Sequence, residues 1–284
     1  MMRFGKEKDK EALKTMWKLC FPDDSDEFIA FYFDRVYSNE ETIVYVEDNI
    51  PVASLQMIPY LLKTGYSASP AAYISGAMTH PEFRQRGFMS RLLCASFEIM
   101  KAKGYVYTFL IPQEEWLFGF YEKWGYVKAF PESILYLTSD FPPQKEDVAV
   151  YDNLQDAMDN FEILWDIYIR FLLEQSNIVL KTQSQFAHIL WDFFNSRGVL
   201  FAGSAGLAFT FPEGNQIVVK EFFYRGEVVR QAFLHSIQTC YNLKELVIFD
   251  VPDAPFVRNK GMIKRLNNRE EVITGIRAGM MLDY

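Results

Sequence analysis

The segment Ile74–Leu93 brings together residue types that can hold a phosphorylated ligand. Its apolar first part stops at Pro81, and a short turn with Arg84, Arg86 and Gly87 leads into a helical pattern. The first backbone N–H groups of a helix lack intrahelical acceptors and lie at the positive end of the helix dipole. Gly87 lets an anion approach the backbone closely, and the two guanidinium groups add full positive charge. The spacing therefore predicts a cradle for a diphosphate.

The elements that must position this turn are indicated by the patterns on either side of it. Residues rich in β-branched and aromatic types predict three successive antiparallel strands before it, at Thr42–Glu47, Pro51–Leu62 and Ala71–Met78. Two helices precede these strands, at Asp9–Cys20 and, behind a serine cap, at Ser25–Tyr37. After the turn, the patterns predict a helix ending near Gly104, a strand at Tyr105–Ile111, a short helix at Glu114–Lys123 and a strand at Tyr126–Leu137.

A polar, proline-bearing stretch without period, Ser139–Asp152, predicts a domain boundary, with domains at 1–140 and 150–284. Beyond it we expect helices at Leu154–Glu174 and Thr182–Asn195, and strands at Val199–Ala202, Leu207–Phe211 and Gln216–Tyr224. A later helix repeats the stripe of the first-half helix, and each follows an Arg-Gly pair, at Arg86-Gly87 and Arg225-Gly226. The repetition indicates an internal duplication, although any strand–helix unit carries such a stripe.

Composition narrows the classes of function. The chain has 284 residues, half of them apolar, and a formal net charge of -8, which disfavours a surface that follows nucleic-acid phosphates. Cys20, Cys94 and Cys240 lack metal-ligand spacing, so we expect reduced core thiols and no metal. No signal peptide and no membrane-spanning stretch is evident, and we expect a cytoplasmic protein without a membrane partner.

The turn that we expect to hold a diphosphate resembles the acetyl-CoA-binding motif of the GNAT superfamily, which is written [QR]-x-x-G-x-[GA]. Arg84, Gly87 and Met89 stand at its defined positions. Methionine in the last position departs from the general pattern and is similar to the Eis-like branch. The segment Phe120–Tyr126 resembles the family's F-Y-E-x-x-G-[FY] segment. The resemblance covers Met1–Leu137 well and the rest loosely. Eis-like enzymes carry a further sterol-carrier-like domain, for which 284 residues leave no room.

The resemblance implies an α+β GNAT fold, with a mixed, mostly antiparallel sheet flanked by helices and followed by a second, degenerate GNAT-like domain. It implies an N-acetyltransferase that uses acetyl-CoA as co-substrate and transfers the acetyl group by direct attack of a primary amine on the thioester. Backbone groups that would hold the pantetheine arm and polarise the thioester lie at Ala77, Met78 and Thr79. The diphosphate would lie on Gln85, Arg86, Gly87, Phe88, Met89 and Ser90, beside Arg84.

Two candidate catalytic groups follow from the same resemblance. Tyr121 stands where the family commonly has its general acid, and a phenol with a pKa of about 10 suits protonation of the departing thiolate. An aromatic ring packed on the sheet is the alternative reading. In the Eis-like branch the terminal carboxylate enters the active site, which makes the carboxylate of Tyr284 a second candidate.

The proton acceptor stays open at the level of the sequence. Carboxylates near the expected acceptor side are either bases, amine anchors or solvated caps: Asp23, Asp24, Asp26, Glu114 and Glu115. His80, His188 and His235 are interpreted as ordinary surface or partly buried residues. The second half lacks the proline and the second arginine before Gly226, and we expect it to bind no CoA.

Two other functions compete with acetylation of a small-molecule or peptide amine. Aminoacyl-tRNA-dependent peptidoglycan transferases also pair two GNAT-like halves, but they need a basic tRNA-binding surface that a net charge of -8 disfavours. The other alternative is a non-catalytic tandem module that binds acyl-CoA or mediates assembly. The sequence leaves self-association into a homo-oligomer open.

Overall fold

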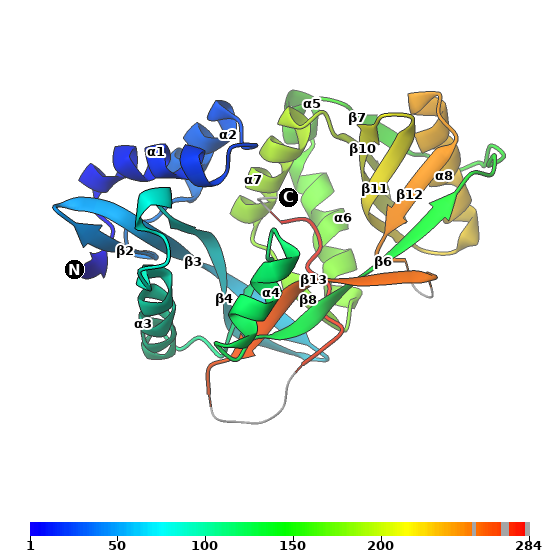
Figure 1. Cartoon of the computed structure of the whole chain (residues 1–284). Helices are drawn as coiled ribbons and strands as arrows, with labels where there is room; N and C mark the ends of the chain where they lie inside the picture. Colours follow the sequence, from blue (N-terminus) through cyan, green and yellow to red (C-terminus); the bar gives the residue numbers. More distant parts are fainter. Residues whose placement is uncertain (252–253, 268–272, 282–284) are drawn as a thin grey trace. The chain divides into compact units, whose positions relative to one another are not determined.

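The computed structural model describes residues 1–251, 254–267 and 273–281, and the chain divides into two compact units (Figure 1). The first unit comprises Met1–Leu62, Ala68–Lys128 and Gly261–Val272. The second unit comprises Lys63–Ser67, Ala129–Lys260 and Ile273–Tyr284. The units do not follow a single cut of the chain at Ser139–Asp152, because strand pairing between residues distant in sequence decides which segments pack together. The assignment of a catalytic domain at 1–140 and a degenerate one at 150–284 stays a prediction.

The first unit contains a mixed sheet whose strands follow the order β1-β2-β3-β4-β5, with the end of β13 beside β5. Its elements are β1 (Met2–Phe4), α1 (Lys10–Cys20), α2 (Asp26–Phe31), β2 (Thr42–Glu47), β3 (Ile50–Thr64) and β4 (Ser67–Thr79) except for their ends at residues 63–67, α3 (Phe88–Ala102), β5 (Tyr107–Leu110), α4 (Glu115–Glu122) and the part of β13 (Phe256–Arg265) from Gly261 onward. β4 and β5 are parallel, whereas β1 with β2, β2 with β3, and β5 with β13 are antiparallel.

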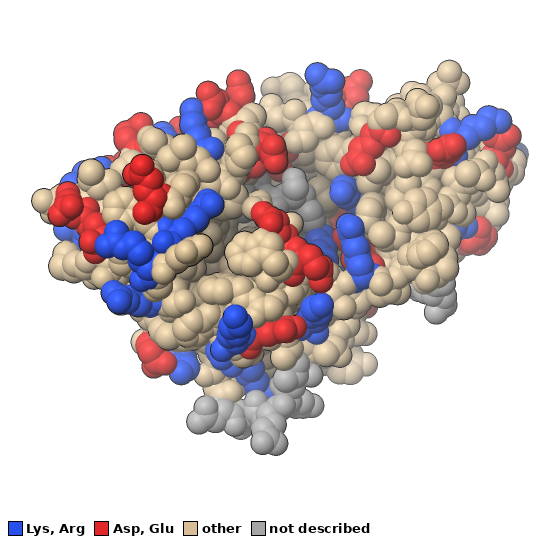
Figure 2. Space-filling model, in the orientation of Figure 1, with Lys and Arg blue, Asp and Glu red and all other residues tan. Residues whose placement is uncertain are grey.

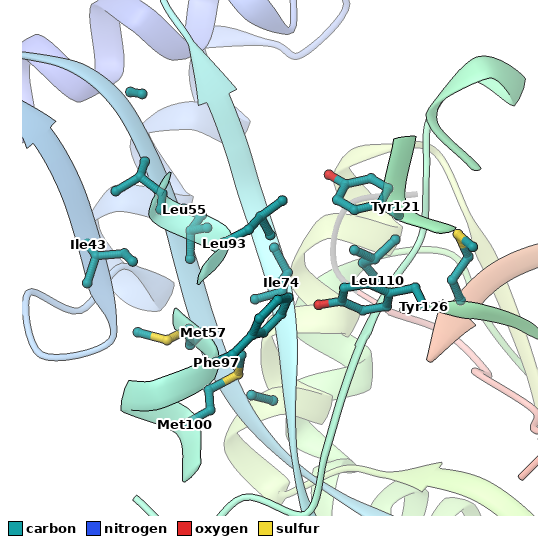
Figure 3. Packing of buried hydrophobic residues seen from close by; sticks show 14 of the residues in the cluster. Ile43, Leu55, Met57, Ile74, Leu93, Phe97, Met100, Leu110, Tyr121 and Tyr126 are labelled. Carbon is teal, nitrogen blue, oxygen red and sulfur yellow. The ribbon is translucent and has the colours of Figure 1, made fainter. Parts of the chain in front are cut away.

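Alternation along β3 and β4 gives this sheet two faces. Leu55 and Ile74 belong to a core that α3 and α4 cover, which Figure 3 shows from close by. Their neighbours Gln56 and Ser75 point the other way, and both hydrogen-bond the Tyr32 hydroxyl at 2.9 Å. Because side chains alternate across a strand, the α1–α2 side and the α3 side of the sheet are packed by different residues of the same strands.

The second unit has the strand order β6-β12-β11-β10-β9-β7. Its elements are β6 (Val127–Leu137), β7 (Ala149–Tyr151), α5 (Leu154–Asp159), α6 (Phe161–Glu174), β8 (Asn177–Leu180), α7 (Gln183–Asn195), β9 (Val199–Gly203), β10 (Gly206–Glu213), β11 (Gln216–Tyr224), α8 (Glu227–Tyr241) and β12 (Glu245–Phe249). α6 and α7 pack on one face of this sheet, around Phe209, and α8 packs on the other, around Phe233.

The two units share one supersecondary pattern. In the first, β4, α3 and β5 form a parallel strand–helix–strand crossover, and in the second β11, α8 and β12 do the same. This confirms the expected fold class, an α+β chain with two GNAT-like halves. The parallel pair within an otherwise mostly antiparallel sheet is what places a helix N-terminus at the end of a central strand.

Two expectations are wrong in detail. The helix predicted at Leu154–Glu174 is broken at Asn160, whose φ of -110° and ψ of 18° leave the helical region. The Asn160 side chain donates to the Asp156 carbonyl at 2.9 Å, and such side-chain bonds to the backbone compete with helix continuation. All three cysteines are free, but Cys94 and Cys240 are exposed, so they are not core thiols. Within the described residues, no helix is long and apolar enough to cross a membrane.

Candidate functional site

The head of α3 is a cluster of unpaired backbone amides, as the sequence predicts. Gly87 is the N-cap residue and adopts a left-handed conformation with φ 75° and ψ 15°, and Gln85 also has a positive φ of 61°. No acidic residue lies in the first turn of α3. In the described part of the chain, the backbone N–H groups of residues 85–90 donate to no protein acceptor, while Arg91 N bonds to Gly87 O at 3.1 Å. The turn therefore offers several donors and a positive dipole end to one anion.

Aromatic rings hold the arginines around this turn. The Arg86 guanidinium lies 5.2 Å from the Phe83 ring centroid and 4.9 Å from that of Phe88, with Glu47 Oε2 at 3.7 Å. Phe88 in turn stacks on Tyr45 at 4.3 Å between centroids. This packing restricts the Arg86 side chain while about half of it stays exposed.

Arg84 contacts the end of β4 and the end of α1, and its part in binding a diphosphate stays a prediction. Its Nε donates to Thr79 O at 3.2 Å, and its Nη2 lies 3.8 Å from Cys20 Sγ. Cys20 Sγ also donates to the Thr79 carbonyl, at 3.4 Å. Arg84 thus ties the turn to the end of β4 and to the end of α1, and it contributes charge to the turn from that braced position.

β4 extends past its parallel partner toward the turn. It pairs with β5 over Ala71–Tyr73 and continues to Thr79, although β5 ends at Leu110. Gly76 has a positive φ of 54° inside the strand, which re-aims the backbone that follows. Met78 is buried, whereas Ala77 and Thr79 are partly exposed. The three predicted arm-binding residues therefore lie in the part of β4 beyond its pairing with β5.

Tyr121 lies on α4 and belongs to the same buried core as residues of β3, β4 and α3. Its side chain is 7% exposed, and burial raises the pKa of its phenol to about 12. Its ring lies 5.7 Å from that of Tyr126, whose hydroxyl hydrogen-bonds Thr108 at 3.1 Å. Among the described residues the Tyr121 hydroxyl has no hydrogen-bond partner. Figure 3 shows the hydroxyl ends of both tyrosines directed toward the side where Ile74 and Leu93 lie.

Of the candidate acceptor-side carboxylates, Asp24 is the one that is partly buried within an aromatic group. Its Oδ2 accepts a hydrogen bond from Trp17 Nε1 at 2.6 Å, and burial raises the pKa of its carboxyl. The Trp17 ring packs against Phe21, Tyr32 and Phe33. The same ring lies 2.7 Å from where a side chain at Gly76 would begin. The Trp17 ring therefore lies between Asp24 and the backbone of β4 at Gly76.

The other predicted carboxylates and histidines are not gathered at this point. Glu114 and Glu115 are exposed, and Glu114 accepts from its own neighbour Trp116. His80 accepts from Glu82 N at 3.4 Å as the cap of a short turn, and His235 Nδ1 contacts Phe141 O at 2.7 Å. Tyr284 lies outside the described residues. In the described part of the chain, no group of three or more His, Cys, Asp or Glu side chains is arranged to hold a metal ion.

Sequence reasoning missed a groove on the outer face of α3. Ser90, Arg91, Cys94 and Ala95 line it from the helix and Trp124 from the turn after α4, and its volume is about 460 Å³. The helical spacing of the first four residues was visible, but nothing local linked them to Trp124. Arg91 is also held by Tyr45, whose hydroxyl accepts from Arg91 Nη1 at 2.9 Å.

A comparison with protein families identifies the family of the part of the chain that contains the α3 turn. Residues 1–129 match the family model of the acetyltransferase (GNAT) domain. This part of the chain is a GNAT acetyltransferase domain. A search of the curated proteins found no match.

Solved structures extend the likeness over nearly the whole chain at the level of the fold. A conserved protein of Enterococcus faecalis V583, described as a probable N-acyltransferase, is 12% identical with a TM-score of 0.77, covering 94% of this chain and 72% of that one. Eis1 from Mycobacterium abscessus is 13% identical with a TM-score of 0.73, covering 94% and 74%. A tandem GNAT protein from the clavulanic acid biosynthesis pathway is 10% identical with a TM-score of 0.54, covering 95% and 100%. The predicted likeness to Eis-like and tandem GNAT proteins is thus confirmed.

Proposed function

We propose that the first unit transfers an acetyl group from acetyl-CoA to a primary amine, by direct attack of the amine on the thioester. The observation that carries this proposal is the head of α3, where free amides, a left-handed glycine and half-exposed guanidinium charge converge without a carboxylate in the first helical turn. This combination favours a diphosphate over a neutral ligand, because both the dipole and the full charges act on the same point. Gln85, Arg86, Gly87, Phe88, Met89 and Ser90 would hold that diphosphate.

The neighbouring residues take the remaining roles of the reaction. The backbone at Ala77, Met78 and Thr79 would hold the pantetheine arm and polarise the thioester carbonyl. Tyr121 would return a proton to the departing thiolate. Because its pKa is raised to about 12, its phenol stays protonated at neutral pH and is available as an acid.

For the acceptor side, we propose that Asp24 anchors the amine. Its carboxylate accepts a hydrogen bond from Trp17, whose ring packs against Phe21 and Tyr32, and a cation gains from both a carboxylate and aromatic faces. We further propose that the terminal carboxylate of Tyr284 accepts the proton of the amine. An added C-terminal glycine, which moves that carboxylate by one residue, should then lower turnover while leaving the affinity for acetyl-CoA unchanged.

The cofactor assignment is tested by calorimetry with acetyl-CoA on three variants. Gly87→Asp places a carboxylate against the diphosphate and should weaken binding roughly a hundredfold or more. Gly87→Asn keeps the shape without the charge and should weaken it much less. Gly104→Asp is the matched control at the other end of α3, because both glycines are exposed, have positive φ and have nothing within 4 Å of an added Cβ. No binding by the wild type at millimolar acetyl-CoA would refute the assignment.

An activity assay distinguishes an enzyme from a non-catalytic acyl-CoA-binding module. Thiol release from acetyl-CoA is measured against a panel of amines, from spermidine to aminoglycosides to lysine peptides. Tyr121→Phe should lower kcat about a hundredfold or more while the affinity for acetyl-CoA stays unchanged, since only the proton donor is removed. Equal thiol release by both proteins would exclude Tyr121 from the reaction, and none by the wild type with any amine would favour the binding module.

A further inference from the structure

The second unit contains a cavity of about 630 Å³ that the proposed reaction does not use. One face of α6 lines it, through Ile163, Asp166, Ile167 and Arg170, which follow one another at helical spacing. The rest is lined by the chain before β7, by the end of β9 with the turn after it, and by α8. All of these segments belong to the second unit, and the volume is in the usual range for a small-molecule site.

Asp166 and Arg170 present opposite charges to this cavity without neutralising each other. Arg170 lies one helical turn after Asp166, and its Nε donates to the Asp166 backbone carbonyl at 3.0 Å instead of to the Asp166 carboxylate. Among the described residues, neither side chain forms an ion pair. Side chains one helical turn apart start about 5–6 Å from each other at Cβ. Such a carboxylate and guanidinium can hold the ammonium and the carboxylate of one α-amino acid, because these two groups share a carbon atom.

The floor of the cavity beside these charges is apolar. Ile167 of α6, Ala202 of β9, and Val229 and Phe233 of α8 line it, and all four side chains are buried. An aliphatic or aromatic side chain of a ligand can leave water against this surface. Such burial adds the affinity that pairing between exposed charges does not supply by itself.

The chain before β7 is a fixed wall of the cavity. The Gln238 side chain of α8 accepts from Phe141 N at 3.2 Å and donates to Ser139 O at 2.9 Å. Gly203 lies close to the same chain, because an added Cβ there would lie 2.8 Å from Asp147 O. The polar stretch that the sequence predicts as a boundary is therefore bound to the second unit and lines a cavity on it.

We propose that this cavity binds a free α-amino acid with an apolar side chain. Asp166 pairs with its ammonium group, Arg170 pairs with its carboxylate, and its side chain lies against Val229 and Phe233. Acidic and basic side chains are interspersed on the surface of the second unit that Figure 2 shows, so selection by charge must come from the walls of the cavity itself. A ligand with one charge leaves one of the two wall charges unpaired. This site is separate from the one proposed for acetyl transfer and does not rest on it.

The test measures the binding of three probes by calorimetry, with the full chain and without acetyl-CoA. L-phenylalanine has both charges, 3-phenylpropionate lacks the ammonium group, and phenethylamine lacks the carboxylate. The wild type should bind L-phenylalanine roughly tenfold more tightly than either of the others. Glycine, which keeps both charges and lacks the side chain, should also bind roughly tenfold or more weakly than L-phenylalanine.

Two substitutions assign the charges of the cavity. Asp166→Asn should remove the preference for L-phenylalanine over 3-phenylpropionate, and Arg170→Gln should remove the preference over phenethylamine. Both side chains are exposed, so neither change opens a hole in the core. Glu162→Gln is the matched control, because it lies on the same helix and outside the cavity lining, and it should change nothing.

Phenethylamine and L-phenylalanine are also amines, which can enter the acceptor side of the first unit. Each titration is therefore repeated with Asp24→Asn, which removes the anchor proposed there. Loss of L-phenylalanine binding in Asp24→Asn, with unchanged binding in Asp166→Asn, would place the ligand in the first unit and overturn the assignment. Equal affinities of the wild type for the three probes, or no binding of L-phenylalanine at millimolar concentration, would overturn it as well. None of these outcomes concerns acetyl-CoA, whose binding is measured separately.

Discussion

The heads of α3 and α8 have a glycine and two arginines at the same spacing but differ in how those arginines are paired. Each 15-residue helix begins after a glycine with positive φ, Gly87 at 75° and Gly226 at 87°, and each has arginines one residue before and four residues after that glycine. In α8, Arg225 pairs with Glu174 and Arg230 with Glu227, which lies in the first turn itself. Both arginines of the α8 head thus pair with carboxylates, one of which lies in the helix itself. At the α3 head Arg86 has Glu47 at 3.7 Å, and Arg91 pairs with no carboxylate among the described residues, so more positive charge is left for a ligand.

The buried polar groups of the two units also differ in charge. In the first unit, Tyr32, Gln56 and Ser75 form a neutral hydrogen-bonded group. In the second, Glu221 and Lys181 are buried, and both approach Gly279, where an added Cβ would lie 2.6 Å from Glu221 Oε1 and 3.1 Å from Lys181 Nζ. The second unit therefore uses its charges to fix its own chain, including the segment before the C-terminus.

The largest effect is expected from removing the buried carboxylate of the second unit. Glu221 Oε2 accepts from Met280 N at 3.1 Å, and burial lowers the pKa of Lys181 to about 8 while Glu221 opposes that shift. Glu221→Leu leaves a buried ammonium without its carboxylate and should lower the free energy of unfolding by about 3–5 kcal/mol. The matched neutral change in the first unit, Gln56→Leu, should cost about 1–3 kcal/mol. Urea denaturation at pH 7 compares them, and equal losses would remove the distinction between the two centres.

The pH dependence of the unfolding free energy should also differ between substitutions in the two units, because the second unit buries a further carboxylate, Asp250. Burial raises the pKa of Asp250 to about 6 from 3.8, against the opposing effect of Arg277 and Lys260. Because the folded state holds this proton more tightly, the contribution of Asp250 to stability is complete below pH 4 and is lost as pH rises through about 6, by at most about 3 kcal/mol. Asp250→Asn should remove this fall. The difference in unfolding free energy between wild type and variant is measured from pH 4 to pH 7, with Gln56→Leu as the flat control; a flat Asp250→Asn difference would contradict the assignment.

The comparison of the helix heads is tested by one matched pair of substitutions. Arg86→Ala removes a charge from the α3 head and should weaken acetyl-CoA binding roughly ten- to a hundredfold, or about 1.5–3 kcal/mol. Arg225→Ala removes the equivalent arginine of α8, which already pairs with Glu174, and should leave the affinity unchanged. Calorimetry measures both. A comparable loss in Arg225→Ala would mean that the α8 head also takes part in binding.

The parts of the site that depend on local chemistry could be predicted from the sequence. Pro81, Gly87 and the apolar stripe of α3 lie within one stretch of chain, and together they predicted the strand end, the turn and the helix start. Strands β2 and β11 have the predicted bounds, because alternation and flanking turn residues are also local signals. The free amides of the α3 head follow from helix geometry alone.

The parts that depend on distant pairings could not be predicted. β13 was not predicted, and it joins the first unit only because Met262–Arg265 pair with β5. The groove needs Trp124 beside Arg91 across a helix packing that no local pattern encodes. The hydrogen bond from Arg84 to the Thr79 carbonyl likewise forms only once β4 and the turn are folded. Lys181 and Glu221 were not singled out, since charged residues in a sequence are mostly exposed.

The smallest effect concerns the ion pair that neutralises the α8 head. Arg225 and Glu174 are both about half exposed, so solvent screens their attraction, and a double-mutant cycle of Arg225→Ala and Glu174→Ala should give a coupling of about 0.2–1 kcal/mol that falls with added salt. Urea denaturation of the four proteins measures it. A coupling of zero would mean that Glu174 does not engage Arg225 in solution. The α8 head would then carry unneutralised charge like that of α3, and Glu227 alone would have to explain why only one of two similar helix heads is arranged for a diphosphate.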